Sequence, residues 1–112
     1  LMKFSITSLL TGNSNNDEEL ISKIKQGAFL ADVREPAELS EGSVEKAVNI
    51  PLGTILKNLQ LSENKTHIIV FCRSGNRSAK AKELLNRNGF TNVSNGGTWK
   101  HINNLITYNN KK

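Results

Sequence analysis

The clearest hydrophobic pattern in this 112-residue chain is a nearly unbroken apolar run at residues 67–71, which ends at the single cysteine, Cys72. A continuous run of this length is typical of a central strand of a parallel sheet, covered on both faces. Shorter segments bounded by turn residues also predict strands, at residues 29–33, 47–50 and 91–94. The cysteine therefore follows directly on the strongest predicted strand.

Between the strands, apolar residues recur at the spacing of an amphipathic helix. The best example is residues 17–25, with acids in the first turn, bases in the last and Gly27 as a stop signal. Further helices are predicted at residues 35–39, 52–61 and 79–88, and a last helix containing Trp99 follows a predicted turn at Gly96–Gly97. Alternating strands and helices predict an α/β domain with a largely parallel sheet, whose ligands bind outside the carboxyl ends of the strands.

The length of the chain fits one small domain. We divide it into an N-terminal segment that we expect to be partly flexible, the domain itself and a C-terminal tail, at residues 1–14, 15–107 and 108–112. Residues 2–10 resemble a signal peptide weakly, but their apolar stretch is short and no A-x-A-like site follows, so we interpret them as mature sequence. No apolar run approaches the roughly 18 residues that span a membrane, and we expect a monomer without a membrane partner.

Charge is distributed unevenly along the chain. Residues 1–64 contain six Lys/Arg and nine Asp/Glu, whereas residues 65–112 contain nine Lys/Arg and a single acid. Cys72 lies in the cationic part, which favours anionic small molecules as ligands. Nucleic acid is a weaker alternative, because Trp99 and Tyr108 are the only Trp and Tyr and no nucleic-acid-binding motif is present.

The residues that follow the strand favour a reactive cysteine over an ordinary buried one. A lone cysteine cannot form an internal disulfide, which is compatible with a reducing cytoplasm, or with the periplasm if an upstream signal peptide has been removed. Nearby cations and a helix N-terminus stabilise a thiolate, and Arg73, Arg77 and the helix predicted near Ser78 would supply both. Gly75 lets the backbone curl so that several N–H groups converge on an anion. A cation such as Arg77 in a first helical turn opposes the helix dipole, which suggests an anionic partner.

The segment Cys72-Arg73-Ser74-Gly75-Asn76-Arg77-Ser78 resembles the active-site loop of the rhodanese, or thiosulfate sulfurtransferase, domain. Four further segments resemble other parts of that family in the same order, at residues 30–38, 42–51, 88–90 and 95–97. The resemblance covers roughly residues 15–107. It implies a doubly wound, mostly parallel sheet of about five short strands with helices on both faces.

The resemblance also implies the roles of individual residues. Cys72 would be the catalytic nucleophile, and the substrate would lie in the loop formed by Arg73, Ser74, Gly75, Asn76, Arg77 and Ser78. Asp32 and Arg34 would support the loop, although the residues themselves favour a structural ion pair or cap. No metal and no organic cofactor is implied.

Some positions depart from the family pattern. Ser43 and Lys46 stand where the family usually has His and Gly. Trp99 follows Gly97 after one residue, whereas the family spacing is Gly-Gly-x-x-x-Trp. We expect these departures to affect local packing more than the chemistry.

By resemblance, Cys72 would take the outer sulfur of thiosulfate as a persulfide and pass it to cyanide, a thiol or an acceptor protein, with ping-pong kinetics. Two alternatives stay open. One is a persulfide carrier or a sensor of sulfur species without turnover. The other is a cysteine phosphatase or arsenate reductase of the related fold, which is less favoured because those enzymes use Cys-x5-Arg, whereas four residues separate Cys72 from Arg77 here.

Overall fold

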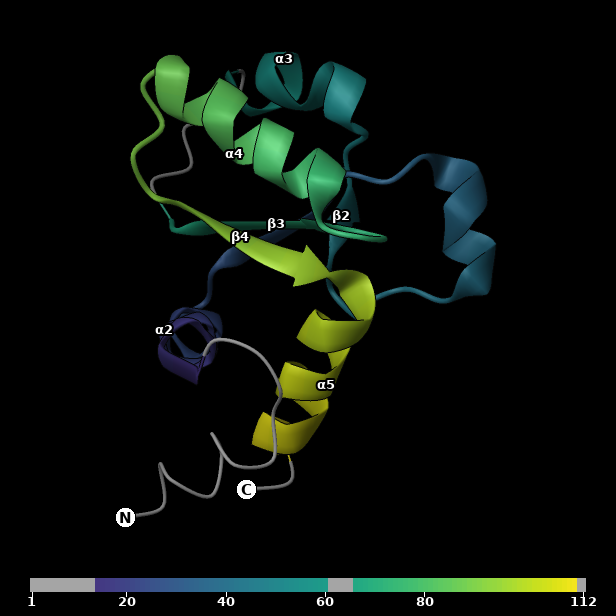
Figure 1. Cartoon of the computed structure of the whole chain (residues 1–112), viewed down its shortest axis with the longest axis vertical. Helices are drawn as coiled ribbons and strands as arrows, with labels where there is room; N and C mark the ends of the chain where they lie inside the picture. Colours follow the sequence, from purple (N-terminus) through teal and green to yellow (C-terminus); the bar gives the residue numbers. More distant parts are fainter. Residues whose placement is uncertain (1–13, 61–65, 111–112) are drawn as a thin grey trace.

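The computed structural model describes residues 14–60 and 66–110 (Figure 1). These residues form a sheet of four parallel strands in the order β2-β1-β3-β4. The strands are β1 (Phe29–Asp32), β2 (Val48–Asn49), β3 (Ile68–Cys72) and β4 (Val93–Thr98). The α/β class is confirmed, and the described part of the chain contains four strands where about five were expected.

Helices cover both faces of the sheet, with α3 and α4 on one side and α2 and α5 on the other (Figure 1). The α-helices are α2 (Ser14–Lys25), α3 (Ile55–Gln60), α4 (Asn76–Arg87) and α5 (Trp99–Asn110), and the 3-10 helices are η1 (Pro36–Glu41) and η2 (Leu52–Thr54). The helix predicted at 52–61 is thus divided into η2 and α3, with its last residue outside the described part. The helix predicted at 79–88 begins earlier, at Asn76, which shortens the loop after the cysteine.

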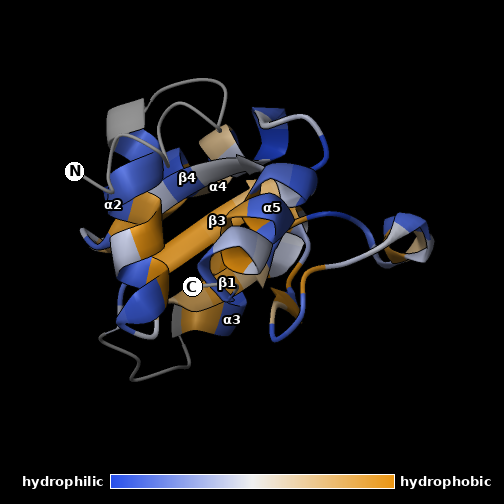
Figure 2. Ribbon diagram, turned by 90° about the horizontal axis from the view of Figure 1, so that it is seen from below, coloured by the Kyte–Doolittle hydropathy of each residue, from blue (hydrophilic) through white to orange (hydrophobic). Residues whose placement is uncertain are grey.

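Strand β3 is the centre of the core, as its apolar run predicted. All five of its residues are buried. Ile68, Val70 and Cys72 pack with α3 and α4, whereas Ile69 and Phe71 pack with α2 and α5. Figure 2 shows this strand in the colour of hydrophobic residues, between helices whose outer surfaces are mostly hydrophilic. Because successive side chains of β3 alternate between the two faces of the sheet, the Cys72 side chain lies on the α4 side.

The turn predicted at Gly96–Gly97 is wrong, because both glycines lie inside β4. The pairing of β4 with β3 shifts register at Val70/Phe71, so that Thr98 becomes the partner of Cys72. A Cβ atom at Gly96 would lie 2.7 Å from Ile102 Cδ1 and 2.9 Å from Ile69 Cγ2. Glycine is therefore needed there for the close packing of α5 on the sheet, not for a reversal of the chain.

Most of the predicted N-terminal segment, including residues 2–10, lies outside the described residues, as do residues 111 and 112. Helix α5 continues through Asn110 and so includes the first three residues of the segment assigned to the tail. In residues 14–60 and 66–110, no helix is long and apolar enough to cross a membrane.

Candidate active site

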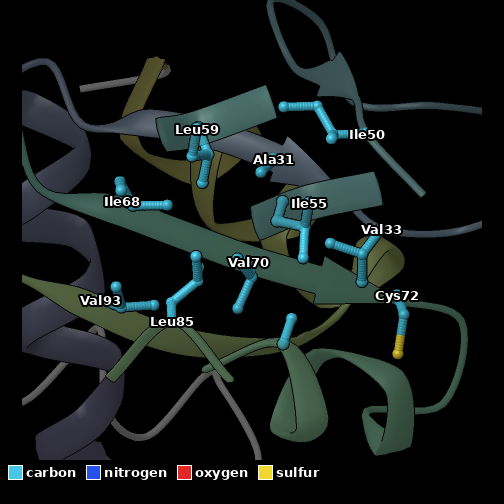
Figure 3. Close-up of a cluster of buried hydrophobic side chains, with 11 residues drawn as sticks. Ala31, Val33, Ile50, Ile55, Leu59, Ile68, Val70, Cys72, Leu85 and Val93 are labelled. Carbon is cyan, nitrogen blue, oxygen red and sulfur yellow. The ribbon is translucent and has the colours of Figure 1, made fainter. Parts of the chain in front are cut away.

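Cys72 is the last residue of β3, and its sulfur atom points from the strand end towards the loop that leads into α4 (Figure 3). Only three residues, 73–75, separate the strand from α4. Gly75 precedes the helix with a φ of 96°, in the left-handed region that glycine adopts without strain. The tight turn folds the start of α4 back onto the sulfur.

Backbone and side-chain groups of this turn converge on Cys72 Sγ. The Gly75 N–H donates a hydrogen bond to Sγ over 3.0 Å, and the Ser78 N–H donates over 3.4 Å. Ser78 Oγ lies 3.6 Å from Sγ and accepts a hydrogen bond from the thiol. The converging N–H groups form the kind of concave site that binds an anion.

These hydrogen bonds change the acidity of the cysteine. Burial raises the pKa of the Cys72 thiol, but hydrogen bonds from the Ser78 side chain and from the backbone of Ser78, Gly75 and Ser74 outweigh it. The pKa of Cys72 therefore lies below its usual value. The sequence suggested two causes, the arginine charges and the N–H groups of the curled loop and helix start, and hydrogen-bond donors of the loop and helix start are the ones that lower the pKa here.

Ser78 is fully buried and connects the sulfur with β4. Its Oγ lies 3.1 Å from the Gly75 carbonyl oxygen and 3.4 Å from the Gly97 carbonyl oxygen, and it can donate a hydrogen bond to either of them. A hydroxyl has one proton and rotates to suit its acceptors. When Cys72 loses its proton, the Ser78 hydroxyl can therefore turn from a carbonyl to the thiolate.

Arg77 has its anionic partner inside the protein. Its Nη1 and Nη2 donate to the two carboxylate oxygens of Glu38 over 2.6 and 2.8 Å. The Arg77 guanidinium lowers the pKa of Glu38 to about 2, and the Glu38 carboxylate raises the pKa of Arg77. Arg77 thus joins the start of α4 to η1, and its cation is largely committed to this pair.

Arg73, in contrast, points into solvent. Its side chain is 64% exposed, and its Nε lies 3.4 Å from Oε1 of Glu41, the last residue of η1. Exposed ion pairs of this length contribute little to stability. The guanidinium of Arg73 can therefore exchange Glu41 for another anion.

Asp32 and Arg34 form a buried ion pair beside the strand ends rather than at the sulfur. Arg34 Nη2 lies 2.7 Å from Asp32 Oδ2, and neither side chain is more than 2% exposed. Arg34 also donates hydrogen bonds to the carbonyl oxygens of Glu38, in the middle of η1, and of Gly42, just after its end. The pair acts on the loop only indirectly, because Arg34 positions η1 and η1 carries the carboxylate that binds Arg77.

Three contributors were not assigned to the site from the sequence: Glu41, which contacts Arg73, Gly97, whose carbonyl oxygen contacts Ser78, and Thr98, which pairs with Cys72. Their local sequence carries no catalytic pattern, and only the sheet register and the path of η1 bring them to Cys72. Within the described residues, no group of three or more His, Cys, Asp or Glu could hold a metal ion.

The geometry agrees with the comparisons to known proteins. A model of the Rhodanese-like domain family matches residues 16–97, which contain the whole Cys72 loop. The chain belongs to this family. It is 34% identical over 73 residues to thiosulfate sulfurtransferase PspE of Escherichia coli, covering 63% of this chain and 70% of PspE. A solved structure of a rhodanese with anions from E. coli superposes with a TM-score of 0.60 at 32% identity, covering 67% of this chain and 91% of that one.

A mitochondrial protein of Schizosaccharomyces pombe is 37% identical over 88 residues, which cover 66% of this chain. The chain spans 62% of that relative, less than two thirds of its length. The match to the rhodanese-like family ends at Gly97, so Thr98, Trp99 and the rest of α5 lie beyond it. The fold and the Cys72 loop are thus those of the family.

Proposed function

We propose that this protein is a sulfurtransferase that moves the outer sulfur of a small anionic donor, such as thiosulfate, to cyanide or a thiol through a persulfide on Cys72. The observation that supports this most is the convergence of donors on Cys72 Sγ, with Gly75 N–H at 3.0 Å and Ser78 N–H at 3.4 Å. They stabilise the thiolate, which is the nucleophilic form of cysteine. Membership of the rhodanese-like family supports the same reaction class.

In the first half-reaction, the Cys72 thiolate attacks the outer sulfur of thiosulfate. A bond forms between Sγ and that sulfur, the sulfur–sulfur bond of thiosulfate breaks, and its electron pair leaves with sulfite. The exposed Arg73 attracts the dianion to the loop. The donors that stabilised the thiolate are then in place for the negative charge of the persulfide, without rearrangement.

In the second half-reaction, cyanide attacks the outer sulfur of the persulfide. Thiocyanate leaves, and the electron pair of the broken bond returns to Cys72 as the thiolate. Because the donor must leave its sulfur on Cys72 before the acceptor removes it, the kinetics are ping-pong. Cys72 is 0% exposed, so both halves require Sγ to become accessible, through rotation of its side chain or movement of residues 73–75.

The proposal is tested by intact mass. Thiosulfate should add the mass of one sulfur atom to the reduced protein, and cyanide should remove it with release of thiocyanate over many cycles. Cys72→Ser, which keeps a similar volume, should show neither effect. An unchanged mass of the reduced protein would overturn the proposal, and loading without repeated thiocyanate release would identify a carrier rather than an enzyme.

A further inference from the structure

A second candidate site adjoins the Cys72 loop. An open pocket of about 420 Å³ lies at the carboxyl ends of β3 and β4, lined by Glu41, Arg73, Thr98, Trp99 and Lys100. Figure 1 shows η1 standing out from the body on the side where these strands end. Thr98 is the register partner of Cys72 and Arg73 is the next residue after it, so the pocket and the reactive loop share a wall. The volume is in the range of sites that hold small organic molecules, not only inorganic anions.

The charges of the pocket favour an anionic ligand. Lys100 lies in the first turn of α5, where a cation opposes the helix dipole. No carboxylate of the described residues forms an ion pair with it, and its Nζ lies 5.8 Å from the centroid of the Trp99 ring. Arg73 has only the loose contact with Glu41 over 3.4 Å. The pocket thus contains two cations, Arg73 and Lys100, and one acid, Glu41, which an anionic ligand can displace from Arg73.

The aromatic wall of the pocket is held rigidly. Trp99 is 7% exposed, and the Arg34 guanidinium lies 4.8 Å from the centroid of its ring. On another side it packs so closely on Gly42 that a Cβ there would come within 2.5 Å of Trp99 Cη2. A preformed wall reduces the entropy lost when a ligand binds. Trp99 departs from the family spacing and lies beyond the residues that the family model matches, so this wall is not part of the matched Cys72 loop region.

We infer that this pocket binds the carboxylate end of an acidic organic thiol, which is the acceptor of the sulfur, and that Glu41 limits its affinity by competing for Arg73. The inference rests on the proposed function, whose second half-reaction leaves the acceptor open. The acceptor thiolate attacks the outer sulfur of the Cys72 persulfide. A new sulfur–sulfur bond forms on the acceptor, the bond to Sγ breaks, and its electron pair returns to the Cys72 thiolate.

The first arm of the test compares two thiols as acceptors from the persulfide-loaded protein. The measured quantity is the ratio of kcat/KM for mercaptosuccinate, which is acidic, to that for 2-mercaptoethanol, which is neutral. Lys100→Gln should lower this ratio about threefold or more, and Glu41→Gln should raise it about twofold to fivefold, as removal of an exposed competing charge allows. The matched controls are Lys57→Gln on α3 and Glu83→Gln, an exposed acid that pairs with Arg87. If Lys100→Gln and Glu41→Gln change this kcat/KM ratio no more than the two control substitutions do, the inference is overturned.

The second arm measures binding without sulfur chemistry. Trp99 is the only tryptophan, so its fluorescence reports on the pocket. Succinate, titrated into the Cys72→Ser protein at constant ionic strength, should change that fluorescence in a saturable way. The dissociation constant should rise with Lys100→Gln and fall with Glu41→Gln. Absence of saturable binding, or binding that neither substitution alters, overturns the inference, whereas failure of persulfide formation alone leaves this arm readable and contradicts only the proposed function.

Discussion

Ser78 is bound to Cys72 at two points, through its backbone N–H at 3.4 Å from Sγ and its hydroxyl at 3.6 Å. The two residues are six positions apart, and the short turn between β3 and α4 brings them together. Burial alone would make Cys72 a weaker acid, and its pKa is lowered because the donors outweigh burial. The acidity of the nucleophile therefore depends on a buried serine more than on the arginines beside it.

Replacing Ser78 with alanine should make the thiol less acidic. The substitution removes the hydroxyl that turns to the thiolate, so the pKa of Cys72 rises and less thiolate is present at neutral pH. Loss of one such hydrogen bond should slow alkylation by iodoacetamide at pH 7 about twofold to tenfold, and the midpoint of the pH–rate profile should move to higher pH.

Ser74→Ala provides the matched control, because Ser74 acts on the thiol through its backbone N–H, which alanine keeps. Its alkylation midpoint should equal that of the wild type. An unchanged midpoint in Ser78→Ala, in a protein whose fold is intact by circular dichroism, would contradict the role assigned to the hydroxyl.

The pair of Glu38 and Arg77 should make stability depend on pH in the acid range. The pKa of Glu38 is lowered to about 2 in the folded protein from 4.5, so folding stabilises the ionised carboxylate. This contribution is fully present above pH 4.5 and is lost as the pH falls towards 2. Glu38→Gln should therefore reduce the free energy of unfolding by about 1 kcal/mol at pH 6, for a pair that is partly exposed, and by less at pH 3.

Urea unfolding at both pH values measures this difference. Glu45→Gln, at an exposed acid that follows η1, serves as the control and should change stability equally little at the two pH values. An effect of Glu38→Gln that is as large at pH 3 as at pH 6 would contradict the assigned charge pair.

Arg34 should matter for stability and not for the acidity of the nucleophile. Arg34→Met leaves the buried Asp32 carboxylate without its ion-pair partner. It also removes the hydrogen bonds that Arg34 donates to the carbonyl oxygens of Glu38 and Gly42. Removal of one member of a buried pair costs about 3–5 kcal/mol, which should appear as a lower midpoint in urea. In protein that stays folded, the pH midpoint of Cys72 alkylation should match the wild type, and a clear shift of that midpoint would show instead that the pair supports the loop directly.

Much of the fold followed from the sequence because the informative signals are local. The apolar run before Cys72 predicted a central strand covered on both faces, and β3 is such a strand. The resemblance of the Cys72 loop to rhodaneses was sufficient to identify the family. The charge of Arg77 in a first helical turn predicted an anionic partner, although the partner in the structure is Glu38 and not a ligand.

The parts that were missed depend on contacts between distant segments. Glu41 meets Arg73 because of the path of η1, which Arg34 holds at Glu38 and Gly42, and no local sequence pattern predicts that path. The pair Gly96–Gly97 has the composition of a turn, but the close approach of α5 makes it part of a bulged strand. Sequence periodicity reports on residues that are close along the chain, whereas both of these features depend on contacts between residues that are far apart in sequence.

The assignment of Gly96 to a packed strand can be tested by overpacking. In Gly96→Ala the new methyl group would lie 2.7 Å from Ile102 Cδ1 and 2.9 Å from Ile69 Cγ2, both parts of buried side chains. Overpacking of this kind should reduce the free energy of unfolding by about 1–3 kcal/mol. Ile102→Val removes the nearer methyl group, so the double variant should recover part of the loss relative to the sum of the single substitutions. Gly53→Ala, where a Cβ meets nothing within 4 Å, is the control and should leave stability nearly unchanged. If Gly96→Ala is as well tolerated as Gly53→Ala, the glycine is not required by the contact with α5.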